Sequence, residues 1–206
     1  MTRRNFLEKT MTGVAGVSII PHLYGFGSSA NDVIRVGVIG PGKRGINLAR
    51  AFMNIEGVQV VAASDVYGRK RERFERMVRD FYSDKNMPAE VKTYEHYHDL
   101  LSRSDIDAVV IATPDHWHAL NTIDALKAGK DVYLEKPMTF TIREGQALRL
   151  AVRDYNRVLG IGSQQRSDPE FQHAVKLVQD GAIGRIQKIN AHVGEPPTFY
   201  NLLKEP

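Results

Sequence analysis

The chain has 206 residues, of which 42% are hydrophobic and 25% are charged, and its formal net charge at neutral pH is +4. This composition is typical of a globular protein with a substantial core. Cysteine is absent, which excludes disulfide bonds and thiolate metal sites. No apolar run reaches the length of about 18 residues that a membrane-spanning helix needs, so no permanent span is predicted.

The first 30 residues are expected to form an export signal rather than part of a domain. The run Arg3-Arg-Asn-Phe-Leu7 precedes a short, mildly apolar segment over residues 11–20. This arrangement resembles a twin-arginine signal, with a cleavage site after Ala30. It predicts a periplasmic or otherwise exported protein whose partners include the twin-arginine export machinery. A basic disordered tail is the alternative interpretation.

The charge balance of the remaining chain argues against nucleic acid as a partner. The first 30 residues contain three basic side chains and one acidic side chain, so the formal charge without them is +2. Nucleic-acid binding usually needs basic residues clustered on one face. We therefore expect no nucleic-acid partner.

A glycine-rich turn organises the domain that follows. The apolar run over residues 33–39 leads into glycines at positions 40, 42 and 45, and a helical pattern continues from Ile46. In a strand, turn and helix of this kind, Gly40 permits the sharp turn and Gly42 lets a pyrophosphate approach the backbone, while Gly45 lets the helix pack closely on the strand. The free N–H groups at the helix N-terminus would hold the phosphates. The candidate phosphate-binding residues are Gly40, Gly42, Lys43, Arg44 and Gly45.

Asp65 is the expected ribose ligand of a bound dinucleotide. It closes a second apolar strand over residues 58–64 and lies twenty-five residues after Gly40, where such a carboxylate is expected. Because Asp65 would repel a 2′-phosphate, the predicted cofactor is NAD rather than NADP. Arg69 and Lys70 could instead bind that phosphate, although a solvated role is favoured for them. A helix N-cap is the alternative role for Asp65.

The rest of the chain alternates between predicted helices and strands. Helices are predicted over residues 68–81, 97–102, 119–128, 142–155 and 168–180, and strands over residues 91–94, 108–112, 131–134, 158–162 and 186–193. This alternation indicates an α/β fold with a doubly wound parallel sheet of the Rossmann type. We assign residues 31–159 to a nucleotide-binding Rossmann domain. Residues 160–206 are expected to begin a second, incomplete domain.

Further candidate residues follow strands at the carboxyl edge of this sheet, where ligands of doubly wound folds bind. The segment 113–118 is predicted to be a loop that contributes Thr113, Pro114, Trp117 and His118. The segment after the sixth strand contributes Gln164, which could contact the nicotinamide ribose or substrate, or form structural hydrogen bonds.

His116 and His118 could be taken for a metal pair. On an extended segment this spacing would put both side chains on one face. No third ligand is apparent in the sequence, so we predict no metal site. Trp117 could stack on cofactor or substrate, or fill a cleft between domains.

These motifs, in this order and at these spacings, resemble the glucose-fructose oxidoreductase, inositol dehydrogenase and MocA (Gfo/Idh/MocA) family over about residues 33–195. Besides the glycine turn, Asp65 and His118, the motifs are Ala112-Thr-Pro114, Glu135-Lys-Pro137 and Gly181-Ala-Ile-Gly-Arg185. The resemblance implies NAD or NADP, a second α/β domain with an open, mostly antiparallel sheet, and a sugar or polyol substrate. It also implies a cis peptide bond before Pro137. The family's Asp-x-x-x-His segment, which supplies its general acid/base, would lie beyond Pro206.

Carried over from the family, Lys136 is the candidate catalytic residue, beside the nicotinamide and the reacting hydroxyl, and Glu135 belongs to the same cofactor site. Desolvation and the positive nicotinamide ring would favour the neutral amine of Lys136 and suit it to proton relay. The alternative is a surface lysine paired with Glu135. We expect an exported NAD(P)-dependent oxidoreductase acting on a carbohydrate or polyol, and a homo-oligomer at full length. An NAD-dependent redox-neutral glycoside hydrolase and a non-enzymatic dinucleotide-binding protein are the alternatives.

Overall fold

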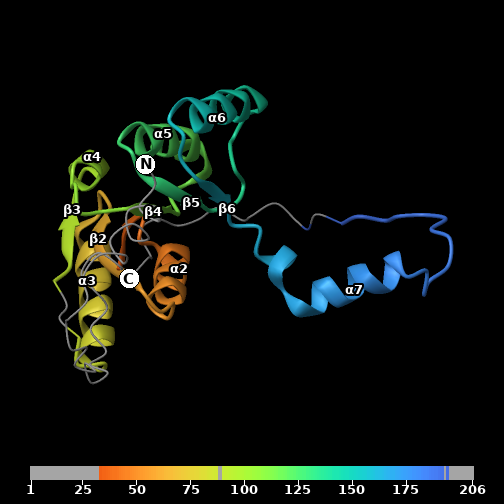
Figure 1. The fold of residues 1–206 in the computed structure, drawn as a ribbon, viewed down its shortest axis with the longest axis horizontal. Coiled ribbons are helices and arrows are strands. Elements are labelled where there is room, and N and C mark those ends of the chain that lie inside the picture. Colours follow the sequence, from red (N-terminus) through yellow and green to blue (C-terminus); the bar gives the residue numbers. More distant parts are fainter. Residues whose placement is uncertain (1–32, 88–89, 193, 195–206) are drawn as a thin grey trace, which may run out of the picture.

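The computed structural model describes residues 33–87, 90–192 and 194 (Figure 1). The expected export signal over residues 1–30 and residues 195–206 lie outside this part of the chain. None of the described helices is long and apolar enough to cross a bilayer.

Six strands form one parallel sheet. Its strands run in the order β3-β2-β1-β4-β5-β6, and every neighbouring pair is parallel. This order is that of the Rossmann fold and confirms the predicted fold class. The strand bounds are β1 Ile34–Ile39, β2 Val58–Ser64, β3 Lys92–Tyr94, β4 Ala108–Ile111, β5 Asp131–Leu134 and β6 Leu159–Ile161.

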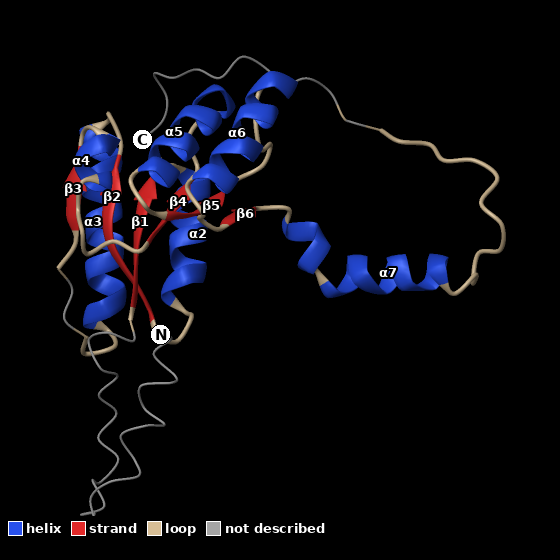
Figure 2. Ribbon diagram, turned by 45° about the horizontal axis from the view of Figure 1, so that its top comes forward, coloured by secondary structure: helices blue, strands red, loops and turns tan. Residues whose placement is uncertain are grey.

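Helices cover both faces of the sheet, α2 and α3 on one face and α4, α5 and α6 on the other (Figure 2). A 3₁₀ turn, η1, and a last helix, α7, follow β6. The helix bounds are α2 Lys43–Met53, α3 Gly68–Ser83, α4 Tyr97–Leu101, α5 Asp115–Lys127, α6 Ile142–Asp154, η1 Gln164–Ser167 and α7 Pro169–Gln179.

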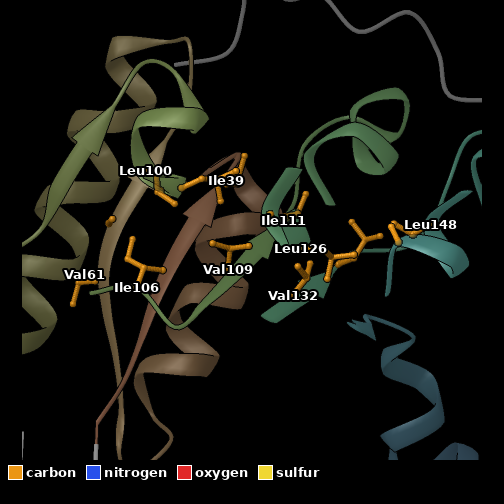
Figure 3. Close-up of a cluster of buried hydrophobic side chains, with 14 residues drawn as sticks. Ile39, Val61, Leu100, Ile106, Val109, Ile111, Leu126, Val132 and Leu148 are labelled. Atoms are coloured by element: carbon orange, nitrogen blue, oxygen red, sulfur yellow. The ribbon is translucent and has the colours of Figure 1, made fainter. Parts of the chain in front are cut away.

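The core consists of one apolar layer on each face of the sheet. One layer packs Phe74 and Val78 of α3 and the buried face of α2 against β1 and β2. Figure 3 shows the other layer, where Leu100 of α4 and Leu126 of α5 meet strand residues such as Ile111. Because both faces are covered, the central strands are largely apolar along their length, as is usual for parallel sheets.

The described chain beyond β6 does not pack on the sheet. Helix α7 projects away from it (Figure 1) and has no buried residue, although Asp168 caps its N-terminus by accepting a hydrogen bond from the Glu170 N–H at 2.9 Å. The predicted strand over residues 186–193 is wrong for its described part, residues 186–192, which form no strand. A strand needs a neighbour to pair with, and none of the described segments lies beside these residues. Val193 is outside the described residues.

The sixth strand extends to Ile161 and pairs with β5. The parallel sheet therefore continues past residue 159, where the boundary of the Rossmann domain was expected. The other predicted elements agree with the structure to within two residues at their ends, except for the starts of α2 and α5.

Candidate functional site

The sheet reverses its strand order between β1 and β4, and the candidate site lies at the carboxyl ends of these strands. A groove of about 630 Å³ runs from the glycine turn after β1 past the end of β2 to the first turns of α4 and α5. Doubly wound sheets bind their ligands at this switch point. Of the predicted cofactor-binding residues, the groove is lined by Gly40, Gly42, Asp65, Thr113, Pro114 and Trp117.

The glycines of the turn have the conformations that their predicted roles require. Gly40 has a φ of +83°, and a Cβ there would come within 2.8 Å of the Thr113 nitrogen. A Cβ on Gly45 would collide with the Gly40 carbonyl oxygen, so this glycine lets α2 pack closely. A Cβ on Gly42 would meet nothing within 4 Å. Thus Gly40 and Gly45 are needed by the fold itself, whereas Gly42 leaves open space in the groove.

The N-terminus of α2 adds electrostatic character to this open space. Its first N–H groups have no partner within the helix, and its first turn contains no acidic residue. The helix dipole therefore points its positive end at the groove beside Gly42. These features fit the pyrophosphate of a dinucleotide.

Asp65 lies at the end of β2 on the edge of the same groove. Its Oδ1 accepts a hydrogen bond from the Tyr67 N–H at 2.9 Å, which closes the turn before α3. The alternative role of Asp65 as a helix N-cap is wrong, because the N-cap of α3 is Tyr67 and no side chain caps this helix. The turn makes no use of Oδ2, so the carboxylate can still accept bonds from a ribose.

The groove also contains a group of residues that sequence reasoning did not assign to the site. They follow β3, the strand next to β2, and are Glu95, His96, Tyr97 and His98. The Tyr97 hydroxyl donates to Asp124 Oδ2 at 2.7 Å, and burial together with this carboxylate raises the pKa of Tyr97 to about 12. The sequence could have indicated these residues, because the carboxyl end of β3 lies at the same edge of a parallel sheet as Asp65 at the end of β2.

The segment after β4 differs from the prediction. Helix α5 begins at Asp115, so residues 115–118 form its first turn rather than a loop. On a helix, positions 116 and 118 point in different directions: His116 is exposed and His118 is buried. The one-face arrangement that an extended segment would give the two histidines therefore does not occur. No group of three potential metal ligands occurs in the described part of the chain.

His118 points into the protein, where both ring nitrogens meet backbone carbonyl groups. Nδ1 lies 2.6 Å from the Pro137 oxygen and Nε2 lies 2.9 Å from the Thr113 oxygen. Both partners are carbonyl oxygens, which can only accept hydrogen bonds. His118 thus links the end of β4 to the segment after β5, while Trp117 lines the groove and is 44% exposed.

The segment after β5 contains the Glu135-Lys-Pro motif. Glu135 is buried, and its Oε1 accepts a hydrogen bond from Arg44 Nε of α2 while its Oε2 accepts one from the Lys136 N–H at 2.8 Å. Burial and the Glu135 carboxylate raise the pKa of the neighbouring Tyr133. The peptide bond between Lys136 and Pro137 is cis, as the family resemblance implied.

Arg44 and Gln164 join the same cluster, since an Arg44 guanidinium nitrogen donates to Gln164 Oε1. Arg44 is therefore engaged with this cluster in the structure. The Lys136 side chain is exposed, and it does not pair with Glu135 as the alternative interpretation of this lysine supposed. Lys43, Arg44, Gly45, His118, Glu135, Lys136 and Gln164 do not line the groove that contains Asp65.

Comparison with known proteins gives this arrangement a family. Residues 34–163 match the model of the Gfo/Idh/MocA oxidoreductase family, described as having an NAD-binding Rossmann fold. A glycosyl hydrolase family 109 protein of Shewanella baltica is 33% identical over 89% of this chain and 44% of its own length. An alpha-N-acetylgalactosaminidase of Shewanella oneidensis is 36% identical over 75% of this chain and 34% of its own length.

A solved structure leads to the same family. The scyllo-inositol dehydrogenase of Lactobacillus casei, with bound NAD(H) and scyllo-inositol, has a TM-score of 0.64 and 26% identity over 74% of this chain and 42% of its own. The chain spans less than half the length of each of these three proteins. The predicted NAD cofactor is confirmed at the level of the family, and the open turn at Gly42 fits it. The chain belongs to the Gfo/Idh/MocA oxidoreductase family and carries its NAD-binding Rossmann fold over residues 34–163.

Proposed function

We propose that the chain is the NAD-binding part of an enzyme that transfers hydride between a hydroxyl-bearing carbon of a carbohydrate or polyol and the nicotinamide. The observation that carries the proposal is the placement of the glycine turn, Asp65 and Lys136 after β1, β2 and β5. Because all three strands are parallel, these residues lie along one edge of the sheet.

Different residues of the chain would bind different parts of the cofactor. The α2 N-terminus and Gly42 would hold the pyrophosphate, and Asp65 would accept hydrogen bonds from the adenosine ribose. Thr113 and Pro114 line the groove between the glycine turn and α5 and would limit the position of the cofactor from that side. When bound, NAD supplies the hydride acceptor, and the protein supplies alignment and proton transfer.

Lys136 is the proposed proton-transfer group of this chain. Its side chain is exposed, so the described residues do not desolvate it. The bound cofactor, the substrate and the additional residues that the longer relatives contain would have to exclude water from Lys136. Those additional residues would also have to supply any further general acid or base. Lys136 would then hold or move the proton of the reacting hydroxyl.

A redox-neutral glycoside hydrolase is a second candidate, favoured by the names of the two Shewanella relatives. In this reaction the same hydride transfer makes elimination of the glycosidic substituent possible, and the hydride is returned in the same turnover. The groove and Lys136 would serve both reactions. The distinction therefore lies in the fate of the hydride.

Product analysis tests the proposal and separates the two reactions. The full-length protein would be incubated with NAD and either scyllo-inositol or an aryl α-N-acetylgalactosaminide, while NADH absorbance and sugar release are followed. Stoichiometric NADH with inositol indicates an oxidoreductase, and sugar release with NAD unchanged indicates a hydrolase. No reaction with either substrate class, or full turnover by Lys136→Ala, would contradict the proposed role of this site.

We also propose that residues 1–30 direct export by the twin-arginine route and that the full-length protein is a homo-oligomer. The paired arginines and the apolar segment support the first proposal. Replacing both arginines by lysines should leave the full-length protein in the cytoplasm of a bacterial host. Unchanged periplasmic recovery of that variant would contradict it.

A further inference from the structure

The backbone around Lys136 is held by side chains from two distant parts of the chain. On the N-terminal side, Glu135 lies between Arg44 and the Lys136 N–H. A Cβ on Gly162 would collide with Glu135 Oε2, so the end of β6 closely confines this carboxylate. Arg44 also donates to Gln164, and this second bond fixes its guanidinium between the ends of β5 and β6.

On the C-terminal side, His118 holds Pro137. The ring contacts the Pro137 carbonyl oxygen at 2.6 Å and the Thr113 carbonyl oxygen at 2.9 Å. His118 is only 1% exposed, so no solvent competes for these contacts. The residue after Lys136 is thereby tied to the end of β4, which lines the cofactor groove.

Lys136 has no side-chain hydrogen bond or ion pair among the described residues. Its position relative to the glycine turn is therefore determined by its neighbours, Glu135 and Pro137. Arg44 belongs to that turn, and Thr113 lies against Gly40. The Arg44–Glu135 contact and the contacts of His118 with Thr113 and Pro137 therefore connect the backbone at Lys136 to the part of the chain that would hold the pyrophosphate.

We propose that Arg44 and His118 are positioning residues that hold the backbone on either side of Lys136 in register with the cofactor groove. The expected effect of these two residues on catalysis rests on the proposed function of Lys136. The contact with Glu135 also changes the role expected for Arg44. The Arg44 guanidinium pairs with the buried Glu135 carboxylate, so it would not bind the cofactor phosphates. The N–H groups at the N-terminus of α2 would bind them instead.

The first test measures the proposed positioning without any turnover. Amide hydrogen exchange at Lys136 reports its bond to Glu135 Oε2, which Arg44 holds in place. We expect Arg44→Met to accelerate this exchange about tenfold relative to the wild-type chain, since a tenfold change corresponds to about 1.4 kcal/mol. Arg50→Gln is the matched control, because Arg50 is an exposed basic residue of the same helix that does not contact Glu135. Unchanged exchange in Arg44→Met would overturn the proposal.

A matched pair of histidine variants tests the other contact. We expect His118→Gln to accelerate exchange of the Lys136 amide, whereas His116→Gln, two residues earlier and exposed, leaves it unchanged. If His118→Gln does not fold, the Arg44 variants decide the proposal alone, since Arg44 is partly exposed. Equal effects of the two histidine variants would show that His118 has no specific role.

Kinetics of the full-length protein then test the catalytic meaning. We expect Arg44→Met to lower kcat about tenfold while the KM for substrate and the Kd for NAD change less than about threefold, and Arg44→Lys to recover part of kcat because it restores a cation beside Glu135. A loss of NAD affinity with kcat unchanged would overturn positioning in favour of phosphate binding. If the wild-type protein turns over neither substrate class, the proposed function fails, and amide exchange still decides whether Arg44 holds Lys136.

Discussion

Asp65 determines the charge at the ribose end of the groove. Asp65 lines the groove together with Tyr67 and Lys70, and the turn before α3 uses only Oδ1 of its carboxylate. We predict that NAD binds more tightly than NADP, because the 2′-phosphate would meet this carboxylate. Asp65→Asn keeps the hydrogen bond to Tyr67 and removes the negative charge. It should therefore reduce the ratio of the NAD affinity to the NADP affinity about tenfold, or by about 1.4 kcal/mol in binding free energy.

Titration of both nucleotides into the two proteins measures this preference directly. Asp99→Asn is the control, because Asp99 is an exposed carboxylate of α4 outside the groove. An NADP affinity equal to that for NAD in the wild-type protein would mean that Arg69 or Lys70 outweighs Asp65.

Single residues of the site were predictable where one chain segment determines their role. The glycines at 40 and 45 are needed by the turn itself, and their spacing made this visible in the sequence. The partner of Arg44 was not predictable, because Glu135 lies 91 residues away and meets it only through the sheet order. The same holds for His118, whose partners become known only when the ends of β4 and β5 are placed side by side.

At the scale of elements, Tyr97 links α4 to α5 at the groove. Its hydroxyl donates to Asp124, and its pKa is raised to about 12 from an ordinary value of 10.0. Because the folded state holds this proton more tightly, the contribution to stability is fully present below about pH 10 and is lost as pH rises from about 10 to 12. Tyr97→Phe should therefore lower the free energy of unfolding by about 1 kcal/mol at neutral pH.

Urea unfolding of the wild-type protein and Tyr97→Phe, without nucleotide and at matched pH values, measures this contribution. The difference in unfolding free energy between the two proteins should be constant from neutral pH to about pH 10 and should shrink between about pH 10 and 12. Tyr82 and Tyr133 titrate in both proteins, so their contributions cancel in this difference. A difference that stays constant up to about pH 12 would contradict the assigned role of the hydroxyl.

Sequence reasoning misplaced two elements, each for its own physical reason. Helix α5 starts at Asp115, directly after Pro114, and the acidic residue in its first turn was a usable signal that the loop interpretation of residues 113–118 overlooked. The strand predicted over residues 186–193 rested on alternation alone. Alternation indicates which face would be buried, whereas a strand forms only where a neighbour is available.

At the scale of the whole molecule, α7 presents an unburied apolar face. Phe171, Val175 and Val178 are 54%, 54% and 39% exposed and recur at the spacing of one helix face. Exposed apolar surface of this kind drives association. We predict that the 206-residue chain self-associates, and that replacing Phe171 and Val175 by glutamine makes it more monomeric.

Size-exclusion chromatography with light scattering measures this association. The matched control replaces Ile142 and Leu150 of α6, which are also exposed, and should leave the association unchanged. A monodisperse wild-type monomer would show that the apolar face of α7 does not cause self-association.

The central claim is that the carboxyl edge of this sheet holds NAD, and Gly42 allows it to be tested without disturbing the fold. Gly42 has a φ of −69°, which any residue adopts, and a Cβ there meets nothing within 4 Å. Gly42→Ala should therefore fold normally and yet place a methyl group where the pyrophosphate is expected. Gly160→Ala, in β6, is the control, because its Cβ would also find room, with the nearest atom at 3.9 Å.

Calorimetric titration of NAD into the wild-type protein and these two variants is the most direct measurement. The structure predicts binding by the wild-type protein and Gly160→Ala, and an affinity at least about tenfold weaker, or about 1.4 kcal/mol, for Gly42→Ala at an unchanged melting temperature. Equal NAD affinity in all three proteins would contradict the assignment of the groove.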